Sequence, residues 1–392
     1  MSQEKMQCAM DSRATTRALP TTASEIARKA IDRHPLTILD VRNEEAYTDW
    51  RIEAAEIRSV NLPYYEMLEG IDAALPYLPN NDPIVVVCAK EGSSRFVAEQ
   101  LIEAGRTRVY FLAGGMKAWS EHLEPVKIGD LTGGGELYQF VRIGKGCLSY
   151  MILSGGEAAV IDAVRMTDIF KQFAEAKGVQ IKHVVDTHLH ADHVSGGRKL
   201  AVDTGARYWL PPEDADEVVY AYDPLEDGQV LSIGDTEIAI RPLYSPGHTI
   251  GSTSLIVDHR YLLSGDLLFV KSIGRPDLAG KAGDWADDLR TTLYSRFKSL
   301  PETLTVLPAH FGNPGEMRED GSISAKLGEL FEHNPGLNIR DAESFRQAVT
   351  MNLPQQPNSY EAIRRTNMGL IEPSQDELQE METGPNRCAI HE

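Results

Sequence analysis

The sequence has few cysteines, no long apolar run and no excess of positive charge. Its 392 residues include four cysteines and no CxxC pair, which argues against a disulfide framework and a zinc knuckle. No stretch approaches the roughly 18 apolar residues of a membrane-spanning helix. The N-terminus lacks the apolar segment of a secretory signal. These absences predict a cytoplasmic protein with no membrane partner.

Acidic residues outnumber basic ones, 58 to 39, so the net charge is −19 and the isoelectric point about 5.0. Such a charge disfavours binding to nucleic acid. An apolar content of 42% and a charged content of 25% are those of an ordinary globular protein. A chain of 392 residues is longer than one hydrophobic core usually serves. We therefore expect two domains that act on small molecules, and the sequence is compatible with a homo-oligomer.

The order of apolar and polar segments divides the chain into four parts. In the first half, short apolar runs such as 36–42 and 83–89 alternate with helical patterns such as 93–105. This alternation is typical of buried parallel strands and their crossover helices. We expect a disordered lead over 1–20, a first domain over 21–126, a second domain over 127–371 and an acidic disordered tail over 372–392.

Apolar runs in the second domain end in polar residues. The stretch 147–163 predicts two strands joined by a turn, 166–178 predicts a helix that ends at Gly178, and 335–370 predicts further helix. The triplet Gly133–Gly135 lacks the Lys-Ser/Thr pair of a phosphate loop and therefore predicts a turn or linker. Loops that follow such runs project from the edge of a sheet, where their polar side chains can form a site.

Seven residues of metal-ligand type follow these apolar runs. The segment THLHADH, 187–193, holds three histidines and an aspartate, and three more ligand-type residues follow later runs. Neutral imidazole and carboxylate are ligands of zinc and of non-heme iron, and several must converge to hold either ion. The candidates are His188, His190, Asp192, His193, His248, Asp266 and His310. His183 and His259 fit no motif and are expected to have ordinary structural roles.

The series THLHADH, GHT, GD and PAH resembles the metallo-β-lactamase fold, an αββα sandwich with metals at one edge of two sheets. The resemblance covers roughly residues 129–350. The stretch SGDLLFVKSIGRPDLAG, 264–280, is similar to the part of persulfide dioxygenases that carries an arginine in a GRxD element after the metal aspartate. The closing segment NPGLNIRDAESFRQAVTMNLPQQPNS is similar to their C-terminal region.

This resemblance implies a division of labour among the seven residues. One Fe(II) per chain would be held by His188, His248 and Asp266, with coordination positions left open for substrate and O2. The other four residues would orient these ligands and hold water; they are His190, Asp192, His193 and His310.

The resemblance also bears on how substrate is held. Arg275, in the GRxD element, would bind the substrate carboxylate or support the loop beside the iron. His310 is followed by Phe311 and Gly312, where the mitochondrial dioxygenases carry Asp-Tyr. Glutathione persulfide would therefore be held differently, or another thiol would be used.

The same seven residues also match the ligand set of a dinuclear zinc hydrolase, and the sequence leaves this alternative open. In such a glyoxalase II-like enzyme, a metal-bound water with its pKa lowered to about 7 would attack a glutathione thioester. A third alternative is a persulfide sensor or carrier with a vestigial metal site, which the complete ligand set disfavours. Metal content separates the three, because they predict one iron, two zincs and no metal.

Cys88 follows a predicted buried strand and precedes a helix. Loop amides and the helix N-terminus would converge on its sulfur, which stabilises a thiolate and a bound persulfide. A phosphatase loop needs arginine after five intervening residues, and here Arg95 comes one position too late. The alternative is a buried structural cysteine. The loop consists of Ala89, Lys90, Glu91, Gly92, Ser93, Ser94 and Arg95, in which Lys90 and Arg95 add positive charge.

Residues 20–125 resemble a rhodanese domain, in the motifs LDVRNEEAY, IRSVNLP, the Cys88 loop and VYFLAGGMKAW. The resemblance implies that Cys88 carries sulfane sulfur as a covalent persulfide. Arg42, in the first motif, is expected to pair with Asp40. The fold expected for the whole chain is an α/β rhodanese domain followed by an αββα metallo-β-lactamase sandwich.

Together, the two resemblances narrow the substrate to a low-molecular-weight persulfide. The sequence predicts an enzyme of sulfur metabolism and sulfide detoxification that oxidises glutathione persulfide, or a similar persulfide, to sulfite with O2 at one iron. Rhodanese sulfur transfer through Cys88 would link thiosulfate, sulfite and thiol. The main alternative is the dinuclear zinc hydrolase with an attached rhodanese domain.

Overall fold

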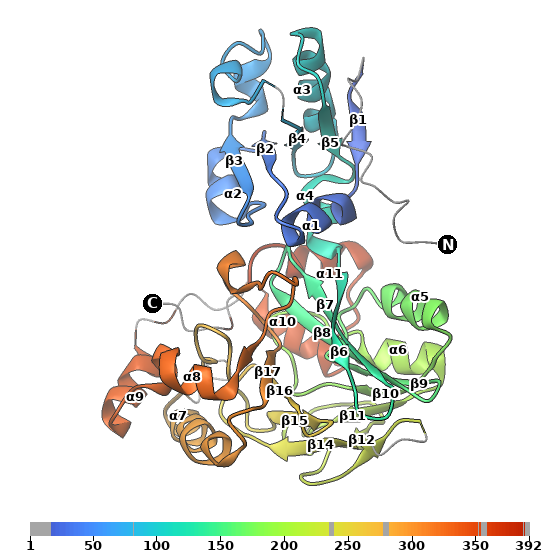
Figure 1. Cartoon of the computed structure of the whole chain (residues 1–392), viewed down its shortest axis with the longest axis vertical. Coiled ribbons are helices and arrows are strands. Elements are labelled where there is room, and N and C mark those ends of the chain that lie inside the picture. The colour runs from blue at the N-terminus through green and yellow to red at the C-terminus, as the bar shows by residue number, and fades with distance from the viewer. Residues whose placement is uncertain are drawn as a thin grey trace. The chain divides into compact units, whose positions relative to one another are not determined.

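The computed structural model describes residues 17–80, 82–234, 239–276, 282–351, 353, 359–386 and 388. The chain forms two compact units, drawn in Figure 1. The first unit consists of the chain up to Glu124 together with two later segments, Arg142–Lys145 and Glu319–Gly321. The second unit contains the remaining residues. No helix within the described ranges is both long and apolar enough to cross a membrane.

The first unit is built on a five-stranded sheet in the order β1-β5-β4-β2-β3. Every pairing in this sheet is parallel, as expected for strands joined by helical crossovers. The strands are β1 (Leu19–Thr21), β2 (Leu36–Asp40), β3 (Ile57–Asn61), β4 (Ile84–Val87) and β5 (Val109–Leu112). The helices are α1 (Ala23–Ile31), α2 (Glu44–Asp49), α3 (Gly92–Glu103) and α4 (Gly115–Glu121).

Strand β4 buries both of its faces. Ile84 and Val86 pack in one core cluster, while Val85 and Val87 pack in another. This follows because successive side chains of a strand point to opposite faces of the sheet. The predicted alternation of strand and helix is confirmed, and Cys88 is placed just past the C-terminal end of a fully buried strand.

The second unit contains two sheets. The seven-stranded sheet has the order β12-β11-β10-β9-β8-β7-β6, and the six-stranded sheet has the order β13-β14-β15-β16-β17-β18. The first contains β6 (Glu124–Asp130), β7 (Glu136–Arg142), β8 (Cys147–Ser154), β9 (Glu157–Ile161), β10 (Gln180–Val185), β11 (Arg207–Leu210) and β12 (Asp223–Pro224). The second contains β13 (Leu231–Ser232), β14 (Ala239–Tyr244), β15 (Thr253–Val257), β16 (Tyr261–Gly265), β17 (Thr305–Pro308) and β18 (Ala325–Lys326).

Helices cover the outer faces of the two sheets (Figure 1). Helices α5 (Asp168–Lys177) and α6 (Gly197–Thr204) contact β10 of the first sheet. Helices α7 (Ala282–Thr291), α8 (Leu327–His333) and α9 (Ala342–Thr350) share a core with the second sheet. The layers are those of the predicted αββα sandwich, and the two strands predicted within 147–163 are confirmed as β8 and β9.

The C-terminal region differs from its prediction. The expected disordered tail over 372–392 contains helix α11 (Gln375–Glu382), which follows helix α10 (Tyr360–Asn367). Ser374 and Glu377 form a capping box at its start, which satisfies amides that the first helical turn leaves free. Glu382 is buried at its end and accepts a hydrogen bond from the Val194 amide at 2.8 Å. The acidic composition suggested disorder, but capping and this tertiary contact favour a docked helix.

Candidate metal centre and cysteine loop

The seven ligand-type residues lie at one edge of the two sheets. Each follows the C-terminal end of a strand: four follow β10, and His248, Asp266 and His310 follow β14, β16 and β17. All seven side chains are buried, with 2% exposure or less. The sequence thus places these polar groups at the ends of apolar strands, and the sandwich brings those ends together.

His188, His248 and Asp266 form one group. The Nε2 atoms of His188 and His248 lie 3.7 and 3.4 Å from Oδ2 of Asp266. One ligand atom from each residue lies within 4.8 Å of the other two. Ligand atoms about 2 Å from a common ion lie roughly 3 Å apart, so three atoms at this spacing can hold one ion.

Hydrogen bonds fix which ring nitrogen of these two histidines is free. Nδ1 of His248 lies 2.8 Å from the carbonyl oxygen of Arg275, which can only accept. Nδ1 of His188 lies 3.1 Å from Oγ1 of Thr187, whose own proton goes to Asp162. Both Nδ1 atoms therefore carry the ring proton. Both Nε2 atoms present a lone pair, as metal-bound histidines do.

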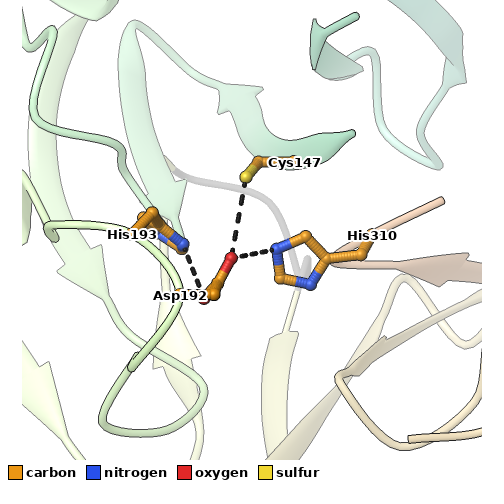
Figure 2. Close-up of side chains that lie close together, drawn as sticks. All are labelled: Cys147, Asp192, His193 and His310. Carbon is orange, nitrogen blue, oxygen red and sulfur yellow. Dashed lines mark hydrogen bonds and ion pairs between the residues drawn. The ribbon is translucent and has the colours of Figure 1, made fainter. Parts of the chain in front are cut away.

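A second group surrounds the carboxylate of Asp192 (Figure 2). Sγ of Cys147 lies 3.8 Å from Oδ2, and Nδ1 of His193 lies 3.0 Å from Oδ1. Nε2 of His310 lies 2.9 Å from Oδ2 without making a hydrogen bond. Nδ1 of His310 donates to Asp266 at 2.6 Å, so the ring lies between two carboxylates. Burial opposes the charge of this ring, but Asp266 and Asp192 raise the pKa of His310 well above its ordinary value. A bound cation would take the place of the proton on Nε2.

His190 groups with Asp162 and Asp186. Its Nε2 lies 3.2 Å from Oδ1 of Asp162 and donates to it, and its Nδ1 has no hydrogen-bond partner among the described residues. Asp162 also accepts from the amide and the hydroxyl of Thr187, at 2.7 and 3.0 Å. It therefore fixes the start of the THLHADH segment as well as one of its histidines.

Five buried atoms of these residues fit a bound cation. Nε2 of His188, His193 and His310, Nδ1 of His190 and Oδ2 of Asp266 have no hydrogen-bond partner in the described part of the chain. Each unsatisfied atom of this kind costs about 1–3 kcal/mol, so five among these neighbouring residues indicate bound cations. Imidazole nitrogen and carboxylate oxygen are donors that both iron and zinc accept. The residues present therefore fit an ion of either metal.

Neighbouring charges set the protonation of the site. Burial and the adjacent His190 lower the pKa of His188 well below its ordinary value. Burial opposes the charge of Asp266, but His310 and the other two imidazoles lower its pKa overall. A neutral imidazole and an ionised carboxylate are the forms that bind a metal. Burial alone would raise the pKa of the Cys147 thiol, yet His310 and His193 lower it to about 6.

Arg275 lies in the loop that follows Asp266. Its side chain is buried, with 1% exposure, and its carbonyl oxygen accepts from His248. The preceding Gly274 has no room for a side chain, since a Cβ there would lie 1.7 Å from the carbonyl oxygen of Asp266. Of the two roles expected for Arg275, its position favours support of this loop over contact with substrate.

A cavity of about 380 Å³ opens beside His248. Its volume lies within the range of about 300–1,000 Å³ that small-molecule sites occupy. Leu189 and Ala191 of the THLHADH segment line one part of it, together with Trp285, Tyr360 and Arg364. A small organic ligand in this cavity would contact the ligand His248.

The Cys88 loop leads from β4 into α3. The Ser94 amide donates to Sγ of Cys88 at 3.4 Å, and Sγ lies 3.3 Å from Oγ of Ser94. Helix α3 begins at Gly92, earlier than the expected start near Ser94. Gly115 has a φ of +60°, and a Cβ there would lie 2.4 Å from the Cys88 carbonyl oxygen. The loop is therefore shaped around Cys88 by a helix N-terminus and a close glycine contact.

The expected cations of this loop point elsewhere or are solvated. Arg95 is mostly exposed and pairs with Glu99 at 3.3 Å along α3, while Lys90 is exposed. Arg42 pairs with Asp40 at 2.7 Å, as predicted. Around the Cys88 sulfur, the structure therefore presents the amide and hydroxyl of Ser94 rather than a cation.

Sequence reasoning missed three buried residues near the metal ligands: Asp162, Cys147 and Cys388. Asp162 ends the apolar run 157–161 just as the predicted ligands end theirs, and this signal could have identified it. Cys147 opens β8, which pairs antiparallel with β9 and so starts at the edge where β9 ends. Cys388 gave no local signal. His183 accepts from Trp209 and contacts the Ser232 carbonyl, which is the structural role expected for it.

Known proteins match both units of the chain. The Rhodanese-like domain model matches residues 22–122, and the Metallo-beta-lactamase superfamily model matches residues 142–310. The chain joins a rhodanese-like domain to a metallo-beta-lactamase domain. Both family resemblances read from the sequence are thereby confirmed.

Relatives of the metallo-beta-lactamase domain include two enzyme classes. Hydroxyacylglutathione hydrolase of Maricaulis maris is 30% identical over 156 residues, which are 40% of this chain and 57% of the hydrolase. The mitochondrial persulfide dioxygenase ETHE1 of Bos taurus is 26% identical over 201 residues, 50% of this chain and 73% of that protein. A metallo-beta-lactamase structure from Staphylococcus aureus subsp. aureus COL superposes with a TM-score of 0.54 at 25% identity, covering 63% of this chain and 75% of that one.

Proposed function

We propose that the metallo-beta-lactamase domain oxidises a low-molecular-weight persulfide with O2, and that the rhodanese-like domain transfers sulfane sulfur through Cys88. The overall oxidation is RSSH + O2 + H2O → RSH + H2SO3. The observation that carries the proposal is the separate group of His188, His248 and Asp266, in which two imidazoles and one carboxylate can share an ion. Such a three-residue face is typical of non-heme Fe(II) oxygenases.

An iron held by His188, His248 and Asp266 would supply the means to activate O2 beside a bound sulfur anion. The other residues would keep these three ligands in place. The Arg275 carbonyl orients His248, Thr187 orients His188 and His310 donates to Asp266. Fixed ligand orientation matters because outer partners of a metal ligand change metal affinity about 10–100-fold.

The cavity beside His248 would hold the organic part of the persulfide. Arg364 and Tyr360 offer a cation and a hydroxyl, and Leu189 and Trp285 offer apolar surface. The cavity is also lined by four acidic residues, Glu213, Asp214, Asp216 and Glu217. A thiol compound that carries both an amino group and a carboxylate, as glutathione does, would meet this description. The similarity to a persulfide dioxygenase over 73% of that protein's length supports the same substrate class.

In the rhodanese-like domain, the Cys88 thiolate would attack the outer sulfur of thiosulfate. An S–S bond forms at Cys88 while the bond from sulfur to sulfite breaks, and sulfite leaves with the electron pair. The Ser94 amide, which donates to Cys88 Sγ, would stabilise the negative charge of the persulfide. Transfer of this sulfur to a thiol then yields the RSSH that the other domain consumes.

A dinuclear zinc hydrolase is the second candidate. It is supported by the second group around Asp192, by the unpartnered Nε2 atoms of His193 and His310, and by the similarity to hydroxyacylglutathione hydrolase. There, the second group would hold a second ion, and hydrolysis of a glutathione thioester would replace oxidation.

Metal analysis of protein purified without oxygen, followed by two assays, separates these candidates. We expect about one iron per chain, O2 consumption with glutathione persulfide and release of sulfite. Two zincs per chain, together with thioester hydrolysis and no O2 uptake, would establish the hydrolase instead.

A matched pair of variants sharpens the comparison. His188→Ala should remove the metal of the first group and the enzyme's activity in either case. His193→Ala should keep most of the iron if only the first group binds it, but should lose half of the metal in a dinuclear enzyme.

A further inference from the structure

Cys388 lies buried at the metal centre. Its side chain is 1% exposed, although it follows α11 in a segment whose composition predicts disorder. Its Sγ lies within 4.8 Å of a ligand atom of Asp266 and of His310, and these two atoms are also within 4.8 Å of each other. The C-terminal segment thus brings a thiol beside two residues of the candidate centre.

Hydrogen bonds and an ion pair hold the segment that carries Cys388 next to the metal ligands. Glu382 accepts from the amide of Val194, the residue after His193, and pairs with Arg165 at 2.5 Å. The Cys388 amide donates to Asn386 Oδ1 at 2.8 Å. The Cys388 carbonyl oxygen accepts from the Arg275 amide at 3.3 Å. Since the Arg275 carbonyl holds His248, one residue connects this segment to a ligand histidine.

A separate observation indicates that the space beside Cys388 takes a cation. Oδ2 of Asp266 and Nε2 of His310 are both buried and have no hydrogen-bond partner among the described residues. Both atoms are of metal-ligand type, and a cation here would satisfy both of them. A thiol next to such a pair has the position of a further ligand, because thiolates bind iron and zinc as readily as imidazoles do.

We infer that Cys388 supplies a thiolate ligand to an ion that it shares with Asp266 and His310. On binding, the thiol gives up its proton and the Sγ lone pair forms the bond to the ion. The inference rests on the proposed metal centre but not on its substrate, since either iron or zinc would accept the sulfur. It assigns the C-terminal segment a role in the centre that the seven histidine and aspartate ligands do not require.

Asp266 belongs both to this group and to the group of His188 and His248. A thiolate ligand beside His310 would therefore act next to the proposed iron ligands, through the carboxylate that the two groups share.

Cobalt substitution tests this inference directly. The full-length protein, loaded with Co(II) in place of its own metal, should show a near-ultraviolet thiolate-to-cobalt charge-transfer band. Cys388→Ser should abolish the band and weaken Co(II) binding at least about tenfold, the loss that even outer partners of a ligand produce. Cys88→Ser is the control, because it removes a buried thiol of the first unit and should leave the band unchanged, whereas Cys147→Ser tests the other thiol that groups with His310.

A rescue experiment guards against a merely structural effect. Cys388→Ala leaves room for a small thiol, so 2-mercaptoethanol should restore the band in this variant and have no effect in the parent. The inference is wrong if the parent protein has no band, if the band survives in Cys388→Ser, or if only Cys147→Ser removes it. These readouts do not depend on O2 uptake, so the proposed oxygenase activity can fail while the ligand assignment stands.

Discussion

Nδ1 of His310 donates a hydrogen bond to Oδ1 of Asp266 at 2.6 Å, between residues that follow two neighbouring parallel strands. Oδ2 of the same carboxylate faces His188 and His248. The two oxygens of Asp266 therefore have different roles. Oδ1 accepts a hydrogen bond from an imidazole, and Oδ2 is available to bind an ion.

This relationship predicts the effect of removing the His310 imidazole. His310→Ala should keep the three ligands but weaken iron binding about 10–100-fold, because Asp266 loses the group that orients it. Titration with Fe(II) under anaerobic conditions measures the change. His333→Ala, in the exposed part of α8, is the control and should bind iron as the parent does. Undiminished affinity in His310→Ala would show that the carboxylate is held by other means.

Asp162 lies outside the three-residue group, but its removal should weaken metal binding as much as removal of a direct ligand would. Asp162→Asn keeps the size of the side chain but weakens its acceptance of the Thr187 amide and hydroxyl and of His190 Nε2. We expect a loss of about 10–100-fold in metal affinity and a lower melting temperature. Asp168→Asn, which alters an exposed carboxylate at the start of α5, provides the comparison in both measurements.

The loop after Asp266 should tolerate no side chain at position 274. Gly274→Ala would place a Cβ 1.7 Å from a backbone oxygen, so the loop must shift. His248 would then lose its hydrogen bond to the Arg275 carbonyl oxygen. We expect destabilisation of about 3 kcal/mol or more, together with loss of bound metal. Denaturant unfolding and metal analysis provide the two readouts. Gly283→Ala, where a Cβ meets nothing within 4 Å, should be neutral or slightly stabilising.

Cys88→Ser should abolish sulfur transfer from thiosulfate to a thiol while leaving oxidation of added persulfide unchanged. Serine keeps the loop's size but cannot carry sulfur. Intact-protein mass spectrometry after thiosulfate treatment should show one added sulfur atom in the parent and none in the variant. Sulfur transfer that survives in Cys88→Ser, or that disappears in Cys147→Ser instead, would remove the basis for the Cys88 assignment.

Removal of the metal should lower the stability of the second domain. An ion present at 100 times its dissociation constant stabilises the folded state by about 2.7 kcal/mol, and a chelator removes that contribution. Calorimetry of the parent protein should therefore show a lower melting temperature after chelation, reversed by Fe(II). His188→Ala should already melt at the lower temperature and should not respond to the chelator.

Sequence patterns predicted the parts of the site that are local in the chain. THLHADH places four ligand-type residues in one loop, and the run before Cys88 specifies a buried strand with its loop at the sheet edge. The later ligands could be predicted because each also follows a buried strand. Strand ends are visible in a sequence whenever an apolar run stops at a polar residue.

The missed residues depend on tertiary contacts. Cys388 is preceded by an acidic stretch that gives no apolar period, and its place is set by Glu382 on the Val194 amide and by the Arg275 amide. Arg275 was predicted from its motif to bind the substrate carboxylate or support the loop, but its burial depends on how the loop around Gly274 packs. The positions of these two residues cannot be predicted from the periodicity of apolar residues. Each position depends on a partner more than 100 residues away or on the space available inside the fold.

The spread of the ligands along the chain also affects when the centre can form. His188 and His310 are separated by 122 residues, which a ribosome adds in roughly 6 to 24 seconds. For that interval the four polar residues after β10 have no partners from β14, β16 or β17. They could bind whichever divalent ion is abundant during synthesis. The correct metal is therefore expected to bind after translation, when the complete set of ligands selects among the available ions.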